Sequence, residues 1–376
     1  MRAILLFFLV TVLFFFSGCG NQGDPSPADN SKDRKEILTH WADNIIVPSY
    51  QQFKAKLDLM VTASEAFTTA PTETSLNEFR SAWLDAYTGW QKVELFEFGP
   101  ADKYTLRNFF NIYPADATGI NAMMQDPAAS LEFPGTYARQ GFPALDYLLN
   151  GLAGDNAAIL AHYTTDGDAA KRLAYVTRIV TRMSSLLNQV ISEWTGTYRD
   201  TFISKTGVDV GSSTSIAVNA YVLEYERYVR SGKIGIPSGA TISTGGTPHP
   251  EKVEAYYKKD ISVALAKTAH QAARDFFNGV NVNTGSEGPS FKSYLDGLGS
   301  KDEVSGAKLS DVIDDQFGII GEKLNTLSSN LFDQIQTANQ PVIDTHSEMQ
   351  KLVRMLKVDM TSAMSITITY TDNDGD

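Results

Sequence analysis

Apolar residues recur at intervals of three and four along most of the chain, and this period constrains the fold more than any other feature of the sequence. Ile37, Trp41 and Ile45 form one such stripe, and Trp83 and Tyr87 belong to another. This spacing places side chains on one face of an α-helix, where they can pack together. The sequence therefore predicts an all-α protein.

Eight stretches carry this period and are expected to be helical. Pro48 should kink the first of them, because proline removes a backbone donor from the helix. Alternating Ile366 and Ile368 give residues 365–370 the pattern of a β-strand, although this segment is too short to define a sheet. The expected helices cover residues 32–60, 72–98, 142–149, 168–194, 212–230, 250–277, 309–335 and 341–358.

Two long stretches lack this regular pattern. Residues 101–139 contain Pro114, Pro127 and Pro134. A connection of this length inside a helical domain is usually functional or packs over a site. Residues 232–250 are rich in Gly, Pro and Thr and are expected to form a loop.

A weak internal repeat indicates how the helices are grouped. Residues 143–154 and 289–299 share Pro, Tyr-Leu and Gly-Leu in the same order, and a long amphipathic helix is expected after each. This predicts two packed helical-bundle domains related by duplication. We place bundle A at residues 32–205 and bundle B at residues 206–376.

Cys19, the sole cysteine of the sequence, follows a secretory signal made of Arg2, an apolar run over residues 3–16 and two small residues. Such a signal is typical of a lipoprotein, whose acylated cysteine becomes the first residue of the mature chain. A plain cleaved signal or an uncleaved anchor is the alternative, but a spanning helix needs roughly 20 apolar residues. We therefore expect a signal peptide at 1–19, a lipid on Cys19 and a flexible tether at 20–31.

The formal net charge of −12 narrows the choice of partners. An acidic surface argues against nucleic acid, whose phosphates bind Lys and Arg, and it permits cationic partners such as metal ions. Lipidation of Cys19 would leave no free thiol, which excludes disulfides, thiolate zinc sites and cysteine nucleophiles.

Two acidic positions are candidates for chemistry. Glu94 and Glu97 lie three residues apart near the end of the expected helix 72–98, so they should share a helix face beside aromatic residues. Carboxylates next to apolar surface can have raised pKa values or bind a cation. The alternative is a solvated face at a helix end, although negative charge there opposes the helix dipole.

A second constellation surrounds Asp146. Pro143 suits the first turn of the expected helix 142–149, and Asp146 follows one turn later on the same face. Its carboxylate could bind a ligand, or it could complement the positive start of the helix.

An ordered set of short segments runs through the chain: Trp90-x-x-x-Glu94-x-Phe96-x-Phe98-Gly99-Pro100, Tyr113-Pro114-x-Asp116, residues 141–151, Glu224 with Ile234-Gly235-Ile236-Pro237, His249-Pro250-Glu251 and Asp372-Asn373-Asp374-Gly375-Asp376. Together they resemble the imelysin-like family, bacterial envelope proteins that are grouped with the metallopeptidases. The resemblance covers essentially the whole chain after the signal. It implies two helical-bundle domains related by duplication, export to the cell envelope and a link to iron uptake.

One position departs from the pattern of that family. The family signature is Gly-x-His-x-x-Glu, in which His and Glu lie one helical turn apart and could both ligate a metal. The corresponding residues here are Gly141, Pro143 and Asp146. The proline ring has no ligating atom, and aspartate is one methylene shorter than glutamate. A zinc hydrolase site is therefore not expected, and no catalytic residue is assigned.

A site for iron or another hard divalent cation, built from oxygen ligands, stays open. Its candidate ligands are Asp146, Glu94, Glu97 and Tyr113. Glu224 is expected to approach this site if the two bundles face each other.

The histidines and the C-terminal tail are weaker candidates for metal ligands. The five His residues are scattered and form no His-Glu-x-x-His pattern, and His249 in the expected loop 232–250 is the best of them. The tail at 372–376 imitates the start of a calcium loop but lacks the later Glu, so a solvated acidic tail is the better interpretation.

These observations predict a bacterial cell-envelope lipoprotein, anchored by lipid at the outer membrane on its periplasmic or surface face. Its expected function is non-enzymatic binding in iron or metal uptake, with the membrane and iron-uptake envelope proteins as partners. Two alternatives stay open. One is a metallopeptidase-like enzyme of the same family, and the other is a structural or interaction module without a small ligand.

Overall fold

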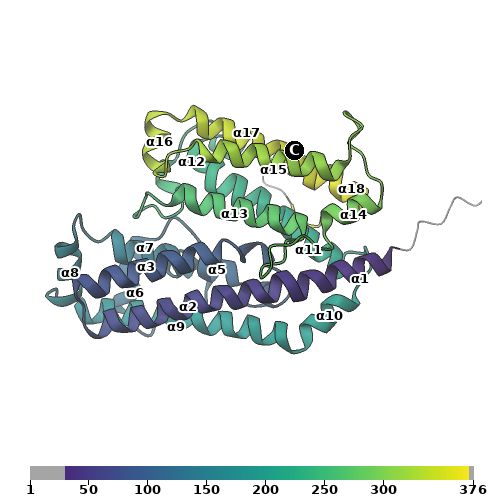
Figure 1. Cartoon of the computed structure of the whole chain (residues 1–376). Coiled ribbons are helices and arrows are strands. Elements are labelled where there is room, and N and C mark those ends of the chain that lie inside the picture. Colours follow the sequence, from purple (N-terminus) through teal and green to yellow (C-terminus); the bar gives the residue numbers. More distant parts are fainter. Residues whose placement is uncertain (1–29, 372–376) are drawn as a thin grey trace, which may run out of the picture. The chain divides into compact units, whose positions relative to one another are not determined.

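The first apolar stripe of the sequence forms an unbroken run of helix in the computed structural model, which describes residues 30–371 (Figure 1). The described residues from Ser31 onward form one compact unit. The predicted signal peptide, Cys19 and the tail at 372–376 lie outside the described residues. The run consists of α1 (Ser31–His40), the π-helical turn η1 (Trp41–Ile46) and α2 (Val47–Thr69).

Pro48 lies in the first turn of α2, directly after η1. Ile46 and Val47 keep right-handed helical dihedral angles, so the chain continues as helix past the proline. A π-helical turn is one of the usual ways in which a long helix accommodates an irregular hydrogen-bond ladder. The irregularity expected at Pro48 therefore coincides with η1.

Helices from the first half of the chain, here called the first-half helices, pack around α2: α3 (Glu73–Trp90), α7 (Gly141–Asn150), α8 (Asn156–Thr164) and α9 (Ala169–Glu193). α2 lies against α3 and α9, and α7 contacts both of these helices. In Figure 1 they form the lower layer. Thr72 and Ser75 form a capping box that starts α3 at the position indicated by the sequence.

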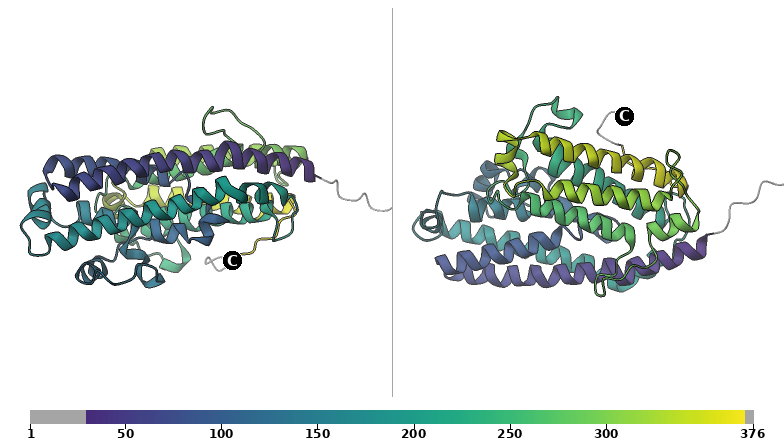
Figure 2. Two further views of the ribbon diagram at one scale, coloured as in Figure 1. Left: turned by 90° about the horizontal axis from the view of Figure 1, so that it is seen from below. Right: turned by 45° about the horizontal axis from the view of Figure 1, so that its top comes forward.

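The second-half helices form the other layer: α11 (Ser213–Leu223), the π-helical η5 (Glu224–Gly235), α13 (Ser262–Asn278), α15 (Leu309–Asn325) and α17 (Gln340–Arg354). α13 packs on α15, α15 packs on α17, and η5 contacts both α13 and α17. Figure 2 shows α13, α15 and α17 running side by side.

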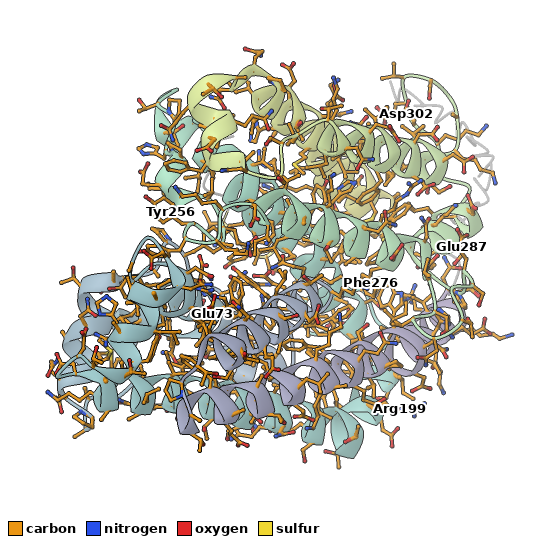
Figure 3. All side chains as sticks on the ribbon, turned by 60° about the vertical axis from the view of Figure 1, so that its left-hand side comes forward. Glu73, Arg199, Tyr256, Phe276, Glu287 and Asp302 are labelled. Carbon is orange, nitrogen blue, oxygen red and sulfur yellow. The ribbon has the colours of Figure 1, made fainter. Side chains whose placement is uncertain are left out.

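One apolar core continues through both sets of helices. The ring of Trp41 lies 4.8 Å from the ring of Phe276 and 4.6 Å from the ring of Phe291, measured between centroids. Phe96 also contacts Phe276, at 5.3 Å. Phe276 on α13 therefore lies at the boundary between the two layers (Figure 3). Buried aromatic pairs of this kind contribute both area and a preferred geometry.

The prediction of an all-α fold is confirmed. Residues 30–371 contain no strand, only two isolated β-bridges, Val280 with Glu287 and Lys301 with Lys308. No helix in this part of the chain is both long enough and apolar enough to cross a membrane. The duplication and the boundary at residue 206 stay predictions.

The strand expected at 365–370 is wrong, and Asn219 on α11 provides the physical reason. Its side-chain Nδ2 donates to the carbonyl oxygen of Thr367 at 3.0 Å. Its Oδ1 accepts from the backbone N–H of Thr369 at 2.7 Å. One side-chain amide thus takes the place that a neighbouring strand would have.

Several helix ends also differ from the prediction. α3 ends at Trp90 rather than at residue 98. The chain stays helical to Ser238, so the loop expected at 232–250 is shorter. The helix expected at 250–277 begins only at Ser262, because Ala255 and Lys259 have positive φ angles of 55° and 64°, which a helix cannot contain. The helix expected at 309–335 is interrupted at 326–330.

Shorter elements connect these helices. They are α4 (Pro100–Lys103), α5 (Leu106–Phe110), α6 (Ala117–Gln125), α10 (Arg199–Ser204), α12 (Ile236–Ser238), α14 (Phe291–Gly297), α16 (Leu331–Thr337) and α18 (Thr361–Ala363), the 3₁₀ turns η2 (Glu94–Phe96), η3 (Pro134–Arg139), η6 (Ile242–Thr244) and η7 (Pro250–Lys252), and the π-helical η4 (Trp194–Tyr198) and η8 (Met355–Met360).

Candidate functional site

Because α3 ends at Trp90, the residues that follow it place polar side chains at the boundary between the two layers. Gln91 and Glu94 follow Trp90 and are 1 % and 2 % exposed. Glu94 opens the 3₁₀ turn η2, and Glu97 caps its end. The two carboxylates therefore do not share an α-helix face, which corrects the prediction from the sequence. They meet different parts of the same buried arginine.

Arg107 on α5 is that arginine, and it links the first-half and second-half helices. Its Nη2 lies 2.5 Å from Glu224 Oε2 on η5 and 2.8 Å from the carbonyl oxygen of Glu94. Its Nε lies 3.8 Å from Glu94 Oε1. Its backbone N–H donates to both carboxylate oxygens of Glu97 at 3.1 Å. The guanidinium also lies over the ring of Tyr228, 4.0 Å from its centroid.

Lys233 on η5 is the second buried cation. Its Nζ lies 2.7 Å from Glu254 Oε2 and 3.8 Å from Glu94 Oε2. The other oxygen of Glu254 accepts from Gln91 Nε2 at 3.0 Å and from Asn111 Nδ2 at 2.8 Å. Glu254 is thus held by donors from both layers, which satisfies a carboxylate that is only 1 % exposed.

We call these ionisable residues the buried charge cluster: Glu94, Glu97, Glu224, Glu254, Arg107 and Lys233. Four carboxylates and two cations would leave a net charge of −2 if all were ionised. A buried excess of negative charge favours protonation of some carboxylates or the approach of a further cation.

The pKa values of three carboxyl groups in the cluster are raised, which favours their protonated forms. Burial raises the pKa of Glu97 to about 7, against the opposing effect of Arg107. Burial raises the pKa of Glu94 above its ordinary value, and the neighbouring Glu224 adds to the effect. Burial likewise raises the pKa of Glu224 although Arg107 and Lys233 oppose it. The cluster can therefore hold protons near neutral pH.

Tyr113 lies beside the buried charge cluster. A Cβ atom added at Gly232 on η5 would stand 3.2 Å from the hydroxyl of Tyr113, so this ring packs directly against the helix that carries Lys233. Burial raises the pKa of Tyr113 well above its ordinary value, and Glu254 and Glu94 contribute to this increase. Of the predicted ligands, Glu94, Glu97, Glu224 and Tyr113 are therefore brought together.

Asp146 has a different set of partners. Its Oδ2 accepts from the backbone N–H of Tyr257 at 2.8 Å, and its Oδ1 accepts from the N–H of Lys258 and from Asn150 Nδ2, both at 3.0 Å. Within residues 30–371 it shares no hydrogen bond or ion pair with the cluster. Burial raises the pKa of Asp146 to about 7, while these three donors favour its charged form. Asp146 thus fastens the irregular segment before α13 to α7.

The other two positions of the altered signature are structural. Gly141 has a positive φ of 73°, and a Cβ atom there would stand 2.2 Å from the carbonyl oxygen of Phe110. Pro143 is buried in the first turn of α7, where a missing N–H costs nothing.

The residues present do not form a metal site in this arrangement. Among residues 30–371, no three His, Cys, Asp or Glu side chains are placed so that they could hold an ion. The carboxylates that converge are already paired with Arg107 and Lys233, and Pro143 supplies no donor atom. The imidazole of His249 lies 3.2 Å from the carboxylate of Glu251, near the surface. The chemistry of the donor set thus differs from that of a metal centre.

Sequence reasoning missed the partners of these acidic residues. Arg107 and Asn111 lie in the irregular stretch 101–139, which the sequence marks only as a connection that packs over a site. Lys233 lies in the expected loop 232–250, and Glu254 lies near the start of the helix expected at 250–277. A charged residue beside apolar neighbours, such as Glu254 after Val253, was the available signal, and it is weak.

Comparisons with known proteins agree on one family. The model of the family described as imelysin, peptidase M75, matches residues 46–354. Iron-regulated protein A of Synechococcus elongatus is 28 % identical over 138 residues, which are 37 % of this chain and 36 % of that protein, so the match spans only about a third of its length.

Two solved structures share the fold. An imelysin-like protein from Psychrobacter arcticum 273-4 has a TM-score of 0.69 and 17 % identity, over 90 % of this chain and 98 % of its own. A protein described as an iron-regulated protein A precursor, from Parabacteroides distasonis ATCC 8503, has a TM-score of 0.65 and 17 % identity, over 89 % and 97 % of the two chains.

Proposed function

Because the chain belongs to the imelysin family, we propose that it is a non-enzymatic binding component of iron acquisition, held at the bacterial cell envelope by a lipid on Cys19. One observation carries the non-enzymatic part of this proposal. At the signature of the family, Pro143 has no ligating atom and the carboxylate of Asp146 is already engaged by three donors. Neither residue is free to bind a metal or activate water.

The link to iron rests on the relatives. Two of them carry the name iron-regulated protein A. The N-terminal signal that ends at Cys19 supports a lipid anchor, with the outer membrane as the expected location. The soluble unit would then work at the end of a tether formed by residues 20–31.

The ligand that this geometry favours is a partner protein or an iron complex rather than a bare ion. The carboxylates of the buried charge cluster are paired with Arg107 and Lys233, so a bare cation would have to displace both. Residues of both layers meet in the cluster. A ligand that shifts one layer against the other would therefore change the distances between the charges of the cluster.

Deletion of the gene tests the proposal in the cell. We expect slower growth than wild type when an extracellular chelator limits iron, and equal growth when iron is added. Complementation with the wild-type gene should restore growth, whereas Cys19→Ser should leave the protein in the soluble fraction and restore growth poorly. Equal growth of the deletion strain under iron limitation would contradict a function in iron acquisition.

A cleavage assay tests the enzymatic alternative separately. Residues 20–376, which include the whole compact unit, are incubated with an unfolded protein substrate, with and without a chelator. We expect the substrate to stay intact in both. Chelator-sensitive cleavage would establish the metallopeptidase alternative in place of our proposal.

A further inference from the structure

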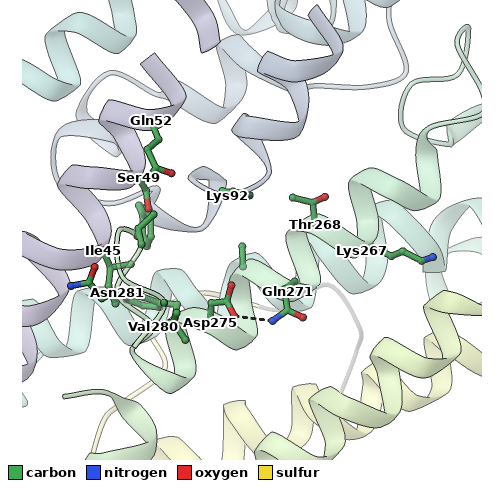
Figure 4. Close-up of a pocket in the computed structure, with 15 residues that line it drawn as sticks. Ile45, Ser49, Gln52, Lys92, Lys267, Thr268, Gln271, Asp275, Val280 and Asn281 are labelled. Carbon is green, nitrogen blue, oxygen red and sulfur yellow. Dashed lines mark hydrogen bonds between the residues drawn. The ribbon is translucent and has the colours of Figure 1, made fainter. Parts of the chain in front are cut away.

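A cavity of about 440 Å³ opens between α2, the segment after α3 and α13 (Figure 4). Its floor is apolar and consists of Ile45, Phe96 and Phe276, which are almost fully buried. Pockets of this size and apolar character hold small organic molecules. The cavity is separate from the buried charge cluster, none of whose residues lines it.

One wall of the cavity is fixed in place before any ligand arrives. The backbone N–H of Val282 donates to the carbonyl oxygen of Asn44 at 3.1 Å, and Asn281 Nδ2 donates to Asn44 Oδ1 at the same distance. His40 Nε2 lies 2.8 Å from the carbonyl oxygen of Gly279. The loop after α13 is thus fastened to η1, and a preformed wall reduces the entropy lost on binding.

Ser49 faces this cavity without a partner. Its side chain lines the cavity, is only 7 % exposed, and makes no hydrogen bond within residues 30–371. Its hydroxyl oxygen is not fully enclosed, so a ligand or a water molecule in the cavity can supply the hydrogen bond that the protein does not. Figure 4 shows Ser49 projecting from α2 toward the cavity.

A cation and an anion line the same cavity at some distance from each other. Lys92 forms no ion pair within the described residues. Burial raises the pKa of Asp275, and the hydrogen bond from Gln271 and the charge of Lys92 oppose this increase. Gln271 Nε2 donates to Asp275 Oδ1 at 2.8 Å, which leaves Asp275 Oδ2 available to accept a hydrogen bond from a ligand. Lys92 and Asp275 are thus near enough to influence each other but lie beyond 4.0 Å, the limit of an ion pair. Lys267 also lines the cavity, but its ammonium points away in Figure 4.

We propose that this cavity binds a free apolar α-amino acid. The carboxylate of the ligand would meet Lys92, its ammonium group would meet Asp275, and Ser49 would add a hydrogen bond. Its side chain would lie on Phe96 and Phe276. A zwitterion with an apolar side chain supplies all of these groups in one small molecule. The site is independent of the proposed function in iron acquisition, and its failure would leave that proposal untouched.

Titration calorimetry with residues 20–376 tests the ligand class. We expect L-phenylalanine and L-leucine to bind. Phenethylamine, which lacks the carboxylate, and 3-phenylpropionate, which lacks the ammonium group, should each bind at least about tenfold more weakly, because each loses one charge-assisted hydrogen bond. Absence of binding by both amino acids would overturn the proposal. Equal affinity for 3-phenylpropionate would overturn it too, because the site would then recognise a simple anion.

Variants locate the site. Lys92→Gln and Asp275→Asn should each weaken L-phenylalanine binding at least about tenfold while the thermal midpoint stays close to that of wild type. Ala272→Phe fills the cavity and should abolish binding. Ala264→Phe is its matched control, because Ala264 is on the same helix, exposed and outside the cavity. Binding that survives Ala272→Phe, or that is lost equally in Ala264→Phe, would place the ligand elsewhere.

Discussion

Arg107 and Glu224 are 117 residues apart in the sequence, yet Arg107 Nη2 and Glu224 Oε2 lie 2.5 Å apart. Both side chains are almost fully buried, and they come from opposite layers of helices. A buried ion pair does not by itself stabilise a fold much, because both charges lose their hydration. Its clearest effect is on the relative position of the two layers. A shift that separated the pair would leave an unpaired charge in the core, which would raise the free energy of the folded state.

Removal of one partner of this pair should therefore be severe. Arg107→Met leaves Glu224 buried without its ion-pair partner and Glu94 with Lys233 alone, and we expect the free energy of unfolding to fall by about 3–5 kcal/mol in urea denaturation. Arg199→Met is the control. It breaks an ion pair with Asp43 near the surface, where the Nη2–Oδ2 distance is 2.6 Å, and should cost less than about 1 kcal/mol.

A double variant separates pairing from burial. If Arg107 and Glu224 act as a pair, Arg107→Met with Glu224→Leu should lose less stability than the sum of the two single losses, by at least about 1 kcal/mol. Additive losses would mean that the interaction between Arg107 and Glu224 contributes little to stability and that each residue is stabilised by its other neighbours.

Protonation of Glu97 should make stability depend on pH. Burial raises its pKa to about 7 in the folded protein, whereas an unfolded Glu titrates near about 4.3. Between these values the folded state binds more protons than the unfolded state, so this contribution is present at low pH and is lost as pH rises toward 7. We expect Glu97→Gln to reduce the fall in the free energy of unfolding between about pH 5 and about pH 8. An unchanged slope would mean that Glu97 is already ionised at pH 5.

Asp146 should control the order of the segment before α13. Asp146→Ala removes the acceptor of the Tyr257 and Lys258 backbone N–H groups, and we expect these two amides to exchange with solvent faster. Asp155→Ala is the control, since Asp155 caps α8 through the N–H of Ala158 and should affect exchange only there. Unchanged exchange at residues 257 and 258 would show that other contacts hold the segment.

Gly141 should tolerate no side chain. Gly141→Ala combines a positive φ with a Cβ atom 2.2 Å from the carbonyl oxygen of Phe110, and we expect a loss of more than about 2 kcal/mol in thermal or urea unfolding. Gly135→Ala meets no atom within 4 Å and should stay within about 0.5 kcal/mol of wild type. Similar stability of the two variants would mean that the backbone at Gly141 relaxes freely.

The sequence predicted the parts of the fold that depend on local pattern. Thr72 and Ser212 cap the helices that were expected to begin at those residues, because a hydroxyl that accepts from the third N–H is a local signal. The all-α class followed from the same apolar period. The end of α3 was placed eight residues too late, because the buried turn around Glu94 is determined by tertiary contacts with Arg107 and Lys233.

The candidate site was predictable only in part. Glu94 and Glu224 stood out as acidic residues in the resembling segments, but the cations that neutralise them did not. Arg107 approaches Glu224, and Lys233 approaches Glu94, only after the two layers pack. Contacts between residues so far apart along the chain cannot be predicted from the spacing of residues in a single sequence. Asp146 was expected among the ligands, and backbone N–H groups, which no side-chain pattern can indicate, bind it instead.

The unbroken run of α1, η1 and α2 has a mechanical consequence. Its η1 turn places Trp41 against Phe276 and Phe291 of the second layer, and its α2 portion forms the middle of the first layer. A force applied at Ser31 would therefore act along one continuous run of helix that contacts both layers. Under such a force the two layers should unfold together, and neither should unfold before the other.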